Sequence, residues 1–452
     1  MNANQLKTCA LAIAATFIVG HAQAGAFQIL EHDAAGTGSA HANTAEAGSI
    51  ASMFANPAAL SFQSGTQFSG VMTPIVFGAR FNSDSATSAV GTPTTGNNGG
   101  DAGGKSIAPA LFFATNLGAN LRFGIGITTP YALRTQYDDG WVGRYFALRT
   151  RLETVDINPS LSLKLNDVVA LGVGVSAQRA DAEISKAIDF GSRCIPGLTP
   201  VLGAAGAAGA CAQGLVTPQT RDGTVILKAN DWQTGFNVGA MFTLSPETRI
   251  GVSYRSAINH KLAGQAAFSN PVLPGALAAL TQTPATTDGN AKAELKLPDV
   301  FSVGLHQKLN TQWALMADVS QTRWSTFKEL RVKFENGAAD SVEIQNYRNT
   351  TRVAVGASFE ARADTVLRGG IAFDPTPVRS EYRARVPDGD RLWVSLGASI
   401  KPSKTMSVDV GFSRLIVREP TAAIVAPGVG TLQGRYEQAS ATVVAFQLNQ
   451  SF

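Results

Sequence analysis

The chain has 452 residues, of which 15% are charged and 45 are glycine, and its formal net charge is +4. This length exceeds one ordinary soluble core, and soluble domains usually carry about 25% charged residues. After the N-terminus no apolar run approaches the about 20 residues of a transmembrane helix. A helical membrane protein is therefore excluded and a transmembrane β-barrel favoured, and the small net charge argues against a nucleic-acid partner.

Residues 1–24 are interpreted as a secretory signal peptide. Lys7 supplies a positive charge, and the apolar stretch Cys9–Gly20 is too short to span a bilayer comfortably. The Ala-Gln-Ala sequence at 22–24 is typical of a cleavage site. We therefore expect the mature chain to begin at Gly25.

The segment that follows, Gly25–Leu60, shows no alternation of apolar and polar residues. It is rich in alanine and glycine and contains Asn56, Pro57 and Ala58 near its end. A wide barrel lumen must be filled or left as a channel. We therefore expect residues 25–65 to form a hatch inside a barrel made by residues 66–452.

Apolar residues recur at every second position from about Thr66 onward. The odd positions are apolar in Phe301–His306, and the even positions are apolar in Leu392–Ile400. A strand between lipid and a wet lumen requires this pattern. Fourteen strands are expected, near residues 66–80, 105–116, 120–130, 150–165, 167–185, 224–243, 246–264, 292–309, 311–328, 346–360, 363–376, 390–401, 404–418 and 436–452.

The connections between these strands alternate between short turns and long loops. This rhythm is typical of outer-membrane barrels, whose short turns are periplasmic, whereas a soluble β-sandwich would not show it. The predicted fold is therefore all-β: a 14-stranded antiparallel transmembrane β-barrel with an N-terminal hatch in its lumen.

Aromatic residues near strand ends are interpreted as girdles at the two membrane interfaces. We expect Trp313 at the periplasmic side, and Trp324 and Trp393 towards the outer side. The chain ends in Phe452. A terminal aromatic residue is associated with recognition by the barrel assembly machinery, which we expect as a partner.

The third and fourth long loops are apolar although they should face the cell exterior. Exposed apolar patches mark binding surfaces, and the alternative is that the two loops pack on each other as a lid. The residues concerned are Ile195, Leu198, Val272, Leu273, Leu277 and Leu280.

Cys194 and Cys211 are the two cysteines that remain after the signal peptide. In an oxidising periplasm we expect a disulfide that closes the third loop. A metal pair is the less favoured alternative, because no histidine lies near either cysteine and two thiolates make a poor zinc site.

Catalytic motifs are not found. The sequence has five histidines but no HExxH, GxSxG or P-loop pattern. His306 is interpreted as a polar lumen residue. We therefore predict no catalytic residue, metal site or cofactor, and a barrel enzyme stays as an alternative that a lipase or protease assay would detect.

Several short motifs follow one another over nearly all of the mature chain: Phe27-Gln28-Ile29, Gly36-Thr37-Gly38, Asn56-Pro57-Ala58, Tyr137–Tyr145, Lys296–Asp299, Trp324–Lys328, Asp374–Pro377 and Pro387–Trp393. These motifs, in this order, resemble those of the FadL family of outer-membrane long-chain fatty-acid transporters.

The resemblance implies a fourteen-stranded barrel closed by a hatch, with a capture groove between the third and fourth loops. It further implies an apolar ligand pocket against the hatch N-terminus, where Phe27, Ile29 and Leu30 would contact an acyl chain. The alternative role of these three residues is to anchor the hatch to the wall.

In this family a kink in the third strand opens the wall sideways, and hatch movement links the pocket to that opening. Gly124, Gly126 and Pro130 occupy the third strand here, and glycine and proline mark bends in strands. Asn56 and Pro57 would set the end of the hatch near that kink. The family also suggests a monomer.

A fatty-acid carboxylate would require a cation, most naturally arginine with its two-donor fork. We expect Arg144 first and Arg323, Arg379 and Arg383 after it, although each would also serve as an ordinary rim charge.

The expected function is passive, ligand-gated uptake of long-chain fatty acids across a bacterial outer membrane, in contact with outer-membrane lipid and lipopolysaccharide. One alternative is uptake of monoaromatic or other hydrophobic hydrocarbons by a branch of the same family. A general porin is the other, and a hatch argues against it.

Overall fold

The computed structural model describes residues 26–273, 275–382 and 384–452. The predicted signal peptide, Gly25 and Arg383 lie outside these ranges. The strands are β1 (Gln67–Ser88), β2 (Gly104–Asn116), β3 (Leu121–Thr128), β4 (Ala132–Gln136), β5 (Arg149–Lys164), β6 (Val169–Asp189), β7 (Asp222–Thr243), β8 (Thr248–Arg255), β9 (Ile258–Ser269), β10 (Gly289–Leu297), β11 (Val300–Lys308), β12 (Trp313–Thr322), β13 (Glu329–Phe334), β14 (Ser341–Ile344), β15 (Thr350–Arg362), β16 (Thr365–Asp374), β17 (Arg391–Ile400), β18 (Met406–Val417), β19 (Thr421–Ala426) and β20 (Gly430–Ser451).

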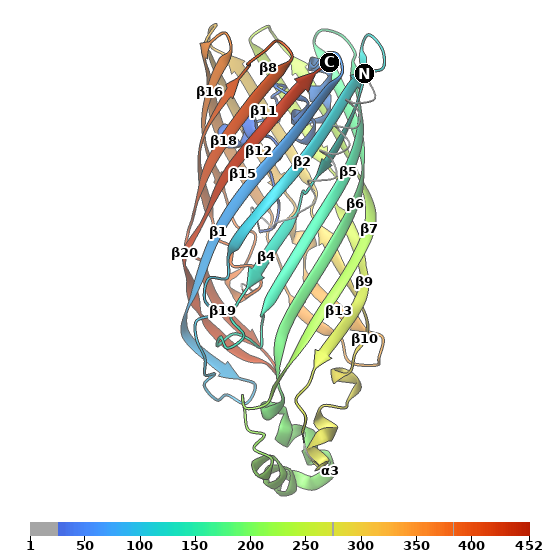
Figure 1. Cartoon of the computed structure of the whole chain (residues 1–452), viewed down its shortest axis with the longest axis vertical. Coiled ribbons are helices and arrows are strands. Elements are labelled where there is room, and N and C mark those ends of the chain that lie inside the picture. Colours follow the sequence, from blue (N-terminus) through green and yellow to red (C-terminus); the bar gives the residue numbers. More distant parts are fainter. Residues whose placement is uncertain (1–25, 274, 383) are drawn as a thin grey trace.

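In the described ranges these strands make fourteen passes around one closed antiparallel barrel (Figure 1). The third pass is split into β3 and β4, the seventh into β8 and β9, and the eighth into β10 and β11. Strands β13, β14 and β19 extend the wall at its outer end. Pairing of β1 with β20, from Gln67↔Ser451 to Ser88↔Gly430, closes the barrel. The predicted fold class is confirmed.

Side chains alternate across the wall as expected. On β11, Phe301, Val303 and Leu305 are exposed on the lipid-facing surface, while Gly304 between them is buried. Trp313 is also exposed, beside Phe359 at a ring distance of 4.7 Å.

The expected outer girdle is wrong for both of its tryptophans. Trp324 is 1% exposed and Trp393 is 0% exposed. Trp393 alternates with the exposed Leu392 and Val394 on β17, so it points into the lumen. The motif position alone did not decide which face of the strand carries the ring.

Residues 26–63 pack inside the barrel. They form α2 (Ala34–Gly38), η1 (Ile50–Phe54) and η2 (Pro57–Phe62), each begun by a side-chain cap from Asp33, Ser49 or Asn56. Helix α2 lies against β16, β17, β18 and β20, and η2 lies against β5, β6 and β7. Close approach requires small residues, because a Cβ on Gly397 would lie 2.8 Å from the Cα of Gly38.

Two buried amide side chains attach this segment to the wall. Asn56 Nδ2 donates to the carbonyls of Thr44 (3.1 Å), Ala240 (3.2 Å) and Val252 (3.3 Å). On the last strand, Gln447 Oε1 accepts from the Ala34 N–H at 2.8 Å, and its Nε2 donates to the hydroxyls of Ser49 and Ser69, each at 3.1 Å.

The third loop is a helix, which the sequence analysis did not predict. Helix α3 (Phe190–Gln213) stands at the outer end, opposite the chain's C-terminus (Figure 1). By length and composition it is the single described helix apolar enough to cross a bilayer. Gly203 breaks it, with φ of 68°, into two shorter pieces. The short helices η3 (Gly275–Leu280), η4 (Pro284–Thr286), η5 (Trp324–Thr326) and η6 (Ser380–Tyr382) complete the fold.

Candidate functional site

An apolar pocket lies in the outer half of the lumen. Strands β4, β5, β9 and β10 place leucines around it, because every second residue of a strand faces inward. Its principal apolar lining residues are Phe27, Leu133, Leu152, Leu262, Leu295, Phe327 and Val386. Such a lining stabilises an apolar group by burial.

Aromatic rings form the floor of this pocket. Phe27 packs edge-on against Trp324, with ring centroids 4.7 Å apart at 78°, and against Phe327 at 6.0 Å. Tyr131 lies 6.2 Å from Phe27, and its hydroxyl donates to the Pro298 carbonyl at 3.1 Å. The contacts of Phe27 with these rings thus anchor the hatch while the same residue lines the pocket.

A second cavity lies on the other side of this floor, towards the short turns. It is polar: Arg255, Arg352, Asp318 and Asp374 line it together with His41 and several hydroxyl groups. Ile29 and Leu30 line this polar cavity and not the apolar pocket. Of the three expected acyl-contacting residues, only Phe27 lies in the apolar pocket.

The hatch carries titratable groups that are buried beside this cavity. Burial raises the pKa of Glu31 to about 7, and the carboxylate accepts from the Leu30 N–H at 2.8 Å. Burial lowers the pKa of His32 to about 3 and raises that of Asp33 to about 6. At neutral pH His32 is therefore uncharged and Glu31 is near its midpoint.

A buried ion cluster holds the start of the hatch. Arg391 Nη2 lies 3.4 Å from Asp388 and 3.6 Å from Asp374. Asp388 also accepts from the Ala26 N–H at 3.2 Å and from the Thr376 hydroxyl. The cluster fixes the chain just before Phe27.

Arg385 is the buried cation of the apolar pocket. Its Nε and Nη2 make a two-donor contact with Glu343 at 2.7 and 2.9 Å, while Nη1 makes only long contacts with Thr150 Oγ1 (3.3 Å) and the Ser185 carbonyl (3.4 Å). Burial raises the pKa of Glu343, but the adjacent Arg385 outweighs it and the pKa lies below its ordinary value. Nη1 is therefore the guanidinium nitrogen with the longest contacts.

The arginines expected from the sequence lie elsewhere. Arg144 is buried in the second loop, where it pairs with Asp222 at 2.8 Å and donates to Thr95 and Tyr145. Arg323 pairs with Asp299 at 2.7 Å, and Arg379 donates to the Asn346 carbonyl at 2.7 Å. None of these three lines the apolar pocket. Arg383 lies outside the described residues.

The third pass is interrupted at residues 129–131. Strand β2 pairs with β3 from Leu111↔Ile127 to Asn116↔Arg122, and the described pairings give β4 a partner in β5 but none in β2. The hatch fills the break. The Ile29 N–H donates to the Pro130 carbonyl at 2.8 Å, and the Ala132 N–H donates to the Phe27 carbonyl at 2.9 Å. Pro130 is therefore at the break.

Gly124 and Gly126 lie below the break, within regular β3. A Cβ on Gly124 would lie 2.7 Å from Leu60, and one on Gly126 would lie 3.0 Å from Phe112. Gly124 thus admits the hatch close to the wall. Asn56 contacts β7 and β8, whereas Leu60 and Met53 of the hatch reach β3.

The third and fourth loops pack together through apolar side chains. Leu198, Leu273 and Leu277 are buried in one cluster with Cys194 and Cys211, and Leu280 packs against it. Ile195 (46% exposed) and Val272 (95% exposed) stay at the surface. Both expectations, the lid and an exposed apolar patch, describe parts of this structure.

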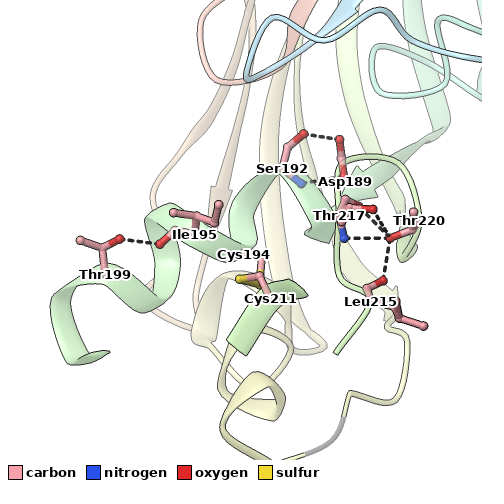
Figure 2. The surroundings of a disulfide bond; sticks show 9 residues. All are labelled: Asp189, Ser192, Cys194, Ile195, Thr199, Cys211, Leu215, Thr217 and Thr220. Atoms are coloured by element: carbon pink, nitrogen blue, oxygen red, sulfur yellow. Dashed lines mark hydrogen bonds between the residues drawn. A yellow bond between two sulfur atoms is a disulfide. The ribbon is translucent and has the colours of Figure 1, made fainter. Parts of the chain in front are cut away.

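Cys194 and Cys211 are joined by a disulfide across the two pieces of α3 (Figure 2). Their Cα atoms are 6.0 Å apart. Asp189 caps the start of the helix by accepting from the Ser192 N–H at 2.9 Å. Metal-ligand clusters of three or more His, Cys, Asp or Glu residues are not found among the described residues.

Sequence reasoning missed Arg385 and the inward leucines of the pocket. Arg385 stands two residues after Arg383 in the same loop, so its charge alone did not distinguish it. Leu152, Leu262 and Leu295 follow the period-two pattern, but only the strand pairing brings them to one level of the lumen. A test of inward apolar residues above the lipid-facing band could have found them.

The chain was compared with known proteins. A family model described as outer membrane protein transport protein (OMPP1/FadL/TodX) matches residues 15–452. A long-chain fatty acid transport protein of Escherichia coli O6:H1 is 28% identical over 414 residues, which cover 89% of this chain and 90% of that protein.

Two solved structures resemble the barrel. A Pseudomonas aeruginosa FadL homologue has a TM-score of 0.82 and 26% identity, with 95% of this chain and 100% of that chain covered. A Ralstonia pickettii toluene transporter, at 21% identity, has a TM-score of 0.62 over 94% of this chain and 99% of that chain. The second likeness concerns the fold alone.

Proposed function

Because the chain belongs to the OMPP1/FadL/TodX family of transport proteins and forms a bacterial outer-membrane barrel for hydrophobic substrates, we propose that it takes up long-chain fatty acids. Family members are transporters and not enzymes. The supporting observation is the apolar pocket that also contains Arg385. An acyl chain gains about 0.8 kcal/mol for each buried CH₂, and Nη1 of Arg385 meets the carboxylate.

Uptake is passive and gated by the ligand. The floor of Phe27 and Trp324 separates the pocket from the polar cavity, so the acyl chain cannot pass straight towards the periplasm without meeting buried charges. The break at 129–131 supplies a side exit, because β4 and β2 are not paired there and the hatch backbone occupies the gap. Movement of residues 27–29 opens it to the lipid.

Capture begins at the apolar surface formed by α3 and η3, where Ile195 and Val272 are exposed. The protein acts as a monomer. It is inserted by the barrel assembly machinery, which recognises β20 and the terminal Phe452. Asn56, Pro57 and Ala58 hold the hatch on β6, β7 and β8 while the ligand moves its N-terminal part.

Uptake of monoaromatic hydrocarbons is the second candidate, because a solved toluene transporter shares the fold. Toluene has no carboxylate, so Arg385 would have no role in its recognition. The buried cation is therefore the observation that favours a fatty acid.

Uptake of labelled oleate and labelled toluene should be measured in cells that lack their own transporter. We expect oleate uptake by the wild type. Arg385→Gln should weaken oleate binding by about tenfold or more, since a hydrogen bond to a charged group contributes about 1.5–3 kcal/mol. Arg379→Gln, at an exposed position outside the pocket, is the matched control.

A variant of Glu343, the partner of Arg385, distinguishes an effect on ligand binding from an effect on the stability of the protein. Glu343→Gln removes the competing negative charge but keeps an amide oxygen that can accept from Arg385, so oleate should bind at least as tightly as to the wild type. Toluene uptake without oleate uptake would assign the protein to the hydrocarbon branch. Uptake of neither by a folded barrel would overturn the transport proposal.

A further inference from the structure

A basic depression lies on the barrel wall where β9, β10 and β13 meet, near the outer end in Figure 1. It is open to solvent. Two carboxylates line it, Glu294 and Glu329, so its lining has six cations against two anions. The basic residues are Lys261, Lys292, Lys296, Lys328, Arg331 and Lys333.

The protein neutralises only part of this charge, because among the described residues three of the six cations have carboxylate partners and three do not. Lys292 and Lys333 stand directly opposite each other in the β10–β13 pairing, and facing like charges repel. Lys292 pairs with Glu335 at 2.6 Å and Lys296 with Glu294 at 3.8 Å. Arg331 pairs with Glu329 at 2.7 Å and with Asp340 at 3.0 Å. Lys261, Lys328 and Lys333 form no ion pair within the part of the chain that the structure describes.

The depression begins just above the lipid-facing band. Strand β11 follows β10 directly and exposes Phe301, Val303 and Leu305. Lys296 precedes Phe301 by five residues, which is at most about 16 Å of extended chain. The cations therefore start at the level of the outer headgroups and continue away from the hydrocarbon.

The hydrogen-bonded pairing of the wall is interrupted at this place. Hydrogen-bonded pairing of β10 with β13 ends at Ala293↔Val332, and the rest of β10 faces residues 326–329 without a described pairing. Leu262, Ala293 and Phe327 line both this depression and the apolar pocket inside. Whatever occupies the depression also covers a thin part of the pocket wall.

We propose that the basic depression binds the phosphate groups of lipopolysaccharide, the phosphorylated glycolipid of the outer leaflet. Lysines act on phosphate as point charges, and basic residues at a membrane surface attract anionic lipid. A single carboxylate would neutralise one of the cations, whereas a head group with several phosphates neutralises cations on several strands at once. The acyl chains of the bound lipid then lie along Phe301, Val303 and Leu305.

Binding should be measured on the purified full chain in detergent by native mass spectrometry. The probes are bis-phosphorylated lipid A, the same lipid A without phosphates, and phosphatidylglycerol. We expect tight binding of the first and weak binding of the other two. Equal binding of the dephosphorylated lipid A, or of phosphatidylglycerol, would overturn the proposal by this measurement alone.

A triple variant locates the site. Lys261→Gln, Lys328→Gln and Lys333→Gln together should weaken lipid A binding by about a hundredfold. The matched control replaces three exposed lysines at the short-turn end, Lys308, Lys401 and Lys404, with glutamine and should bind lipid A like the wild type.

Oleate binding to the triple variant gives a second readout. It should stay at the wild-type value, because Arg385 and the leucines of the pocket are unchanged. Oleate binding that falls while lipid A binding persists would mean that the depression serves the substrate and would overturn the lipid proposal. Lipid A binding equal to that of the wild type would do the same.

Discussion

The apolar pocket and the polar cavity lie on two sides of the Phe27–Trp324 contact, and they differ in the side chains that surround them. Leucines and one buried cation line the first, whereas Arg255, Arg352, Asp318 and Asp374 line the second. An acyl chain is stabilised in the first, while the second would require its charges to lose water for no compensating bond. One lumen can therefore stabilise an apolar ligand in its outer half and still block its direct passage towards the periplasm.

Removing the partition should have the largest effect. Trp324→Ala leaves a hole where the indole contacted Phe27, Tyr131 and Tyr347, and such a cavity costs about 3–5 kcal/mol. The two cavities then merge. We expect weaker oleate binding and a higher single-channel conductance in planar bilayers.

Trp313→Ala is the control for this change, because the same ring is lost from an exposed, lipid-facing position. Its conductance should equal that of the wild type. Unchanged conductance of Trp324→Ala would mean that the polar cavity is closed by other side chains.

The polar side of the partition should respond to pH through Glu31. Its pKa is about 7 in the folded hatch and about 4.5 in an unfolded chain, so folding favours the protonated form. This stabilisation is complete below the unfolded value and is lost as the pH rises through 7. The free energy of hatch opening should fall by about 3 kcal/mol across this window.

Hydrogen exchange of the amides of residues 27–33, corrected for intrinsic rates, measures that opening. Glu31→Gln should lack this part of the pH dependence. His32 and Asp33 titrate in both proteins, so the difference between the two curves isolates Glu31. Parallel curves would contradict the buried-carboxylate explanation.

Filling the apolar side should sharpen its length preference. Ala229→Phe places a ring among Leu152, Leu227 and Leu262, and the ligand loses about 0.8 kcal/mol for each CH₂ displaced. Long acids should therefore lose affinity more than short ones in a binding series. Ala317→Phe, on the lipid-facing side of β12, is the control, and an equal loss at all chain lengths would argue against this pocket.

The smallest effect on pocket binding is expected far from both cavities. Replacing Cys194 and Cys211 by serine removes a cross-link that stabilises the ordered loop by about 3 kcal/mol. Amides of α3 should exchange faster, while the equilibrium affinity of the pocket for oleate stays at the wild-type value. A large loss of affinity would show that the lid is coupled to the pocket.

The barrel was predictable because period two and the loop rhythm are properties of short stretches. Strand ends such as Ser88 and Gly430 lie beyond their expected positions, since the outer wall continues past the lipid with the same alternation. Helix α3 was missed because Pro196, Pro200 and the glycines near 203 oppose a helix locally, whereas packing on η3 and the disulfide support it.

The site was less predictable than the fold. Arg144 and Trp324 were identified by motif, yet a motif does not say that Asp222 neutralises the first or that the second faces the lumen. Arg385 acquires its position from Glu343, which is far away in the sequence and near only after β14 has formed. Such pairings depend on the closed barrel.

Gln447 links α2 and η1 to the first strand from a position on the last one. The hydroxyls of Ser69 and Ser49 and the N–H of Ala34 gain this partner only when Gln447, five residues before the C-terminus, has been synthesised. The hatch cannot complete this attachment until β20 has taken its place beside β1. We therefore expect seating of the hatch to be coupled to pairing of β1 with β20, so that a chain without its final strand keeps a hatch that lacks these bonds.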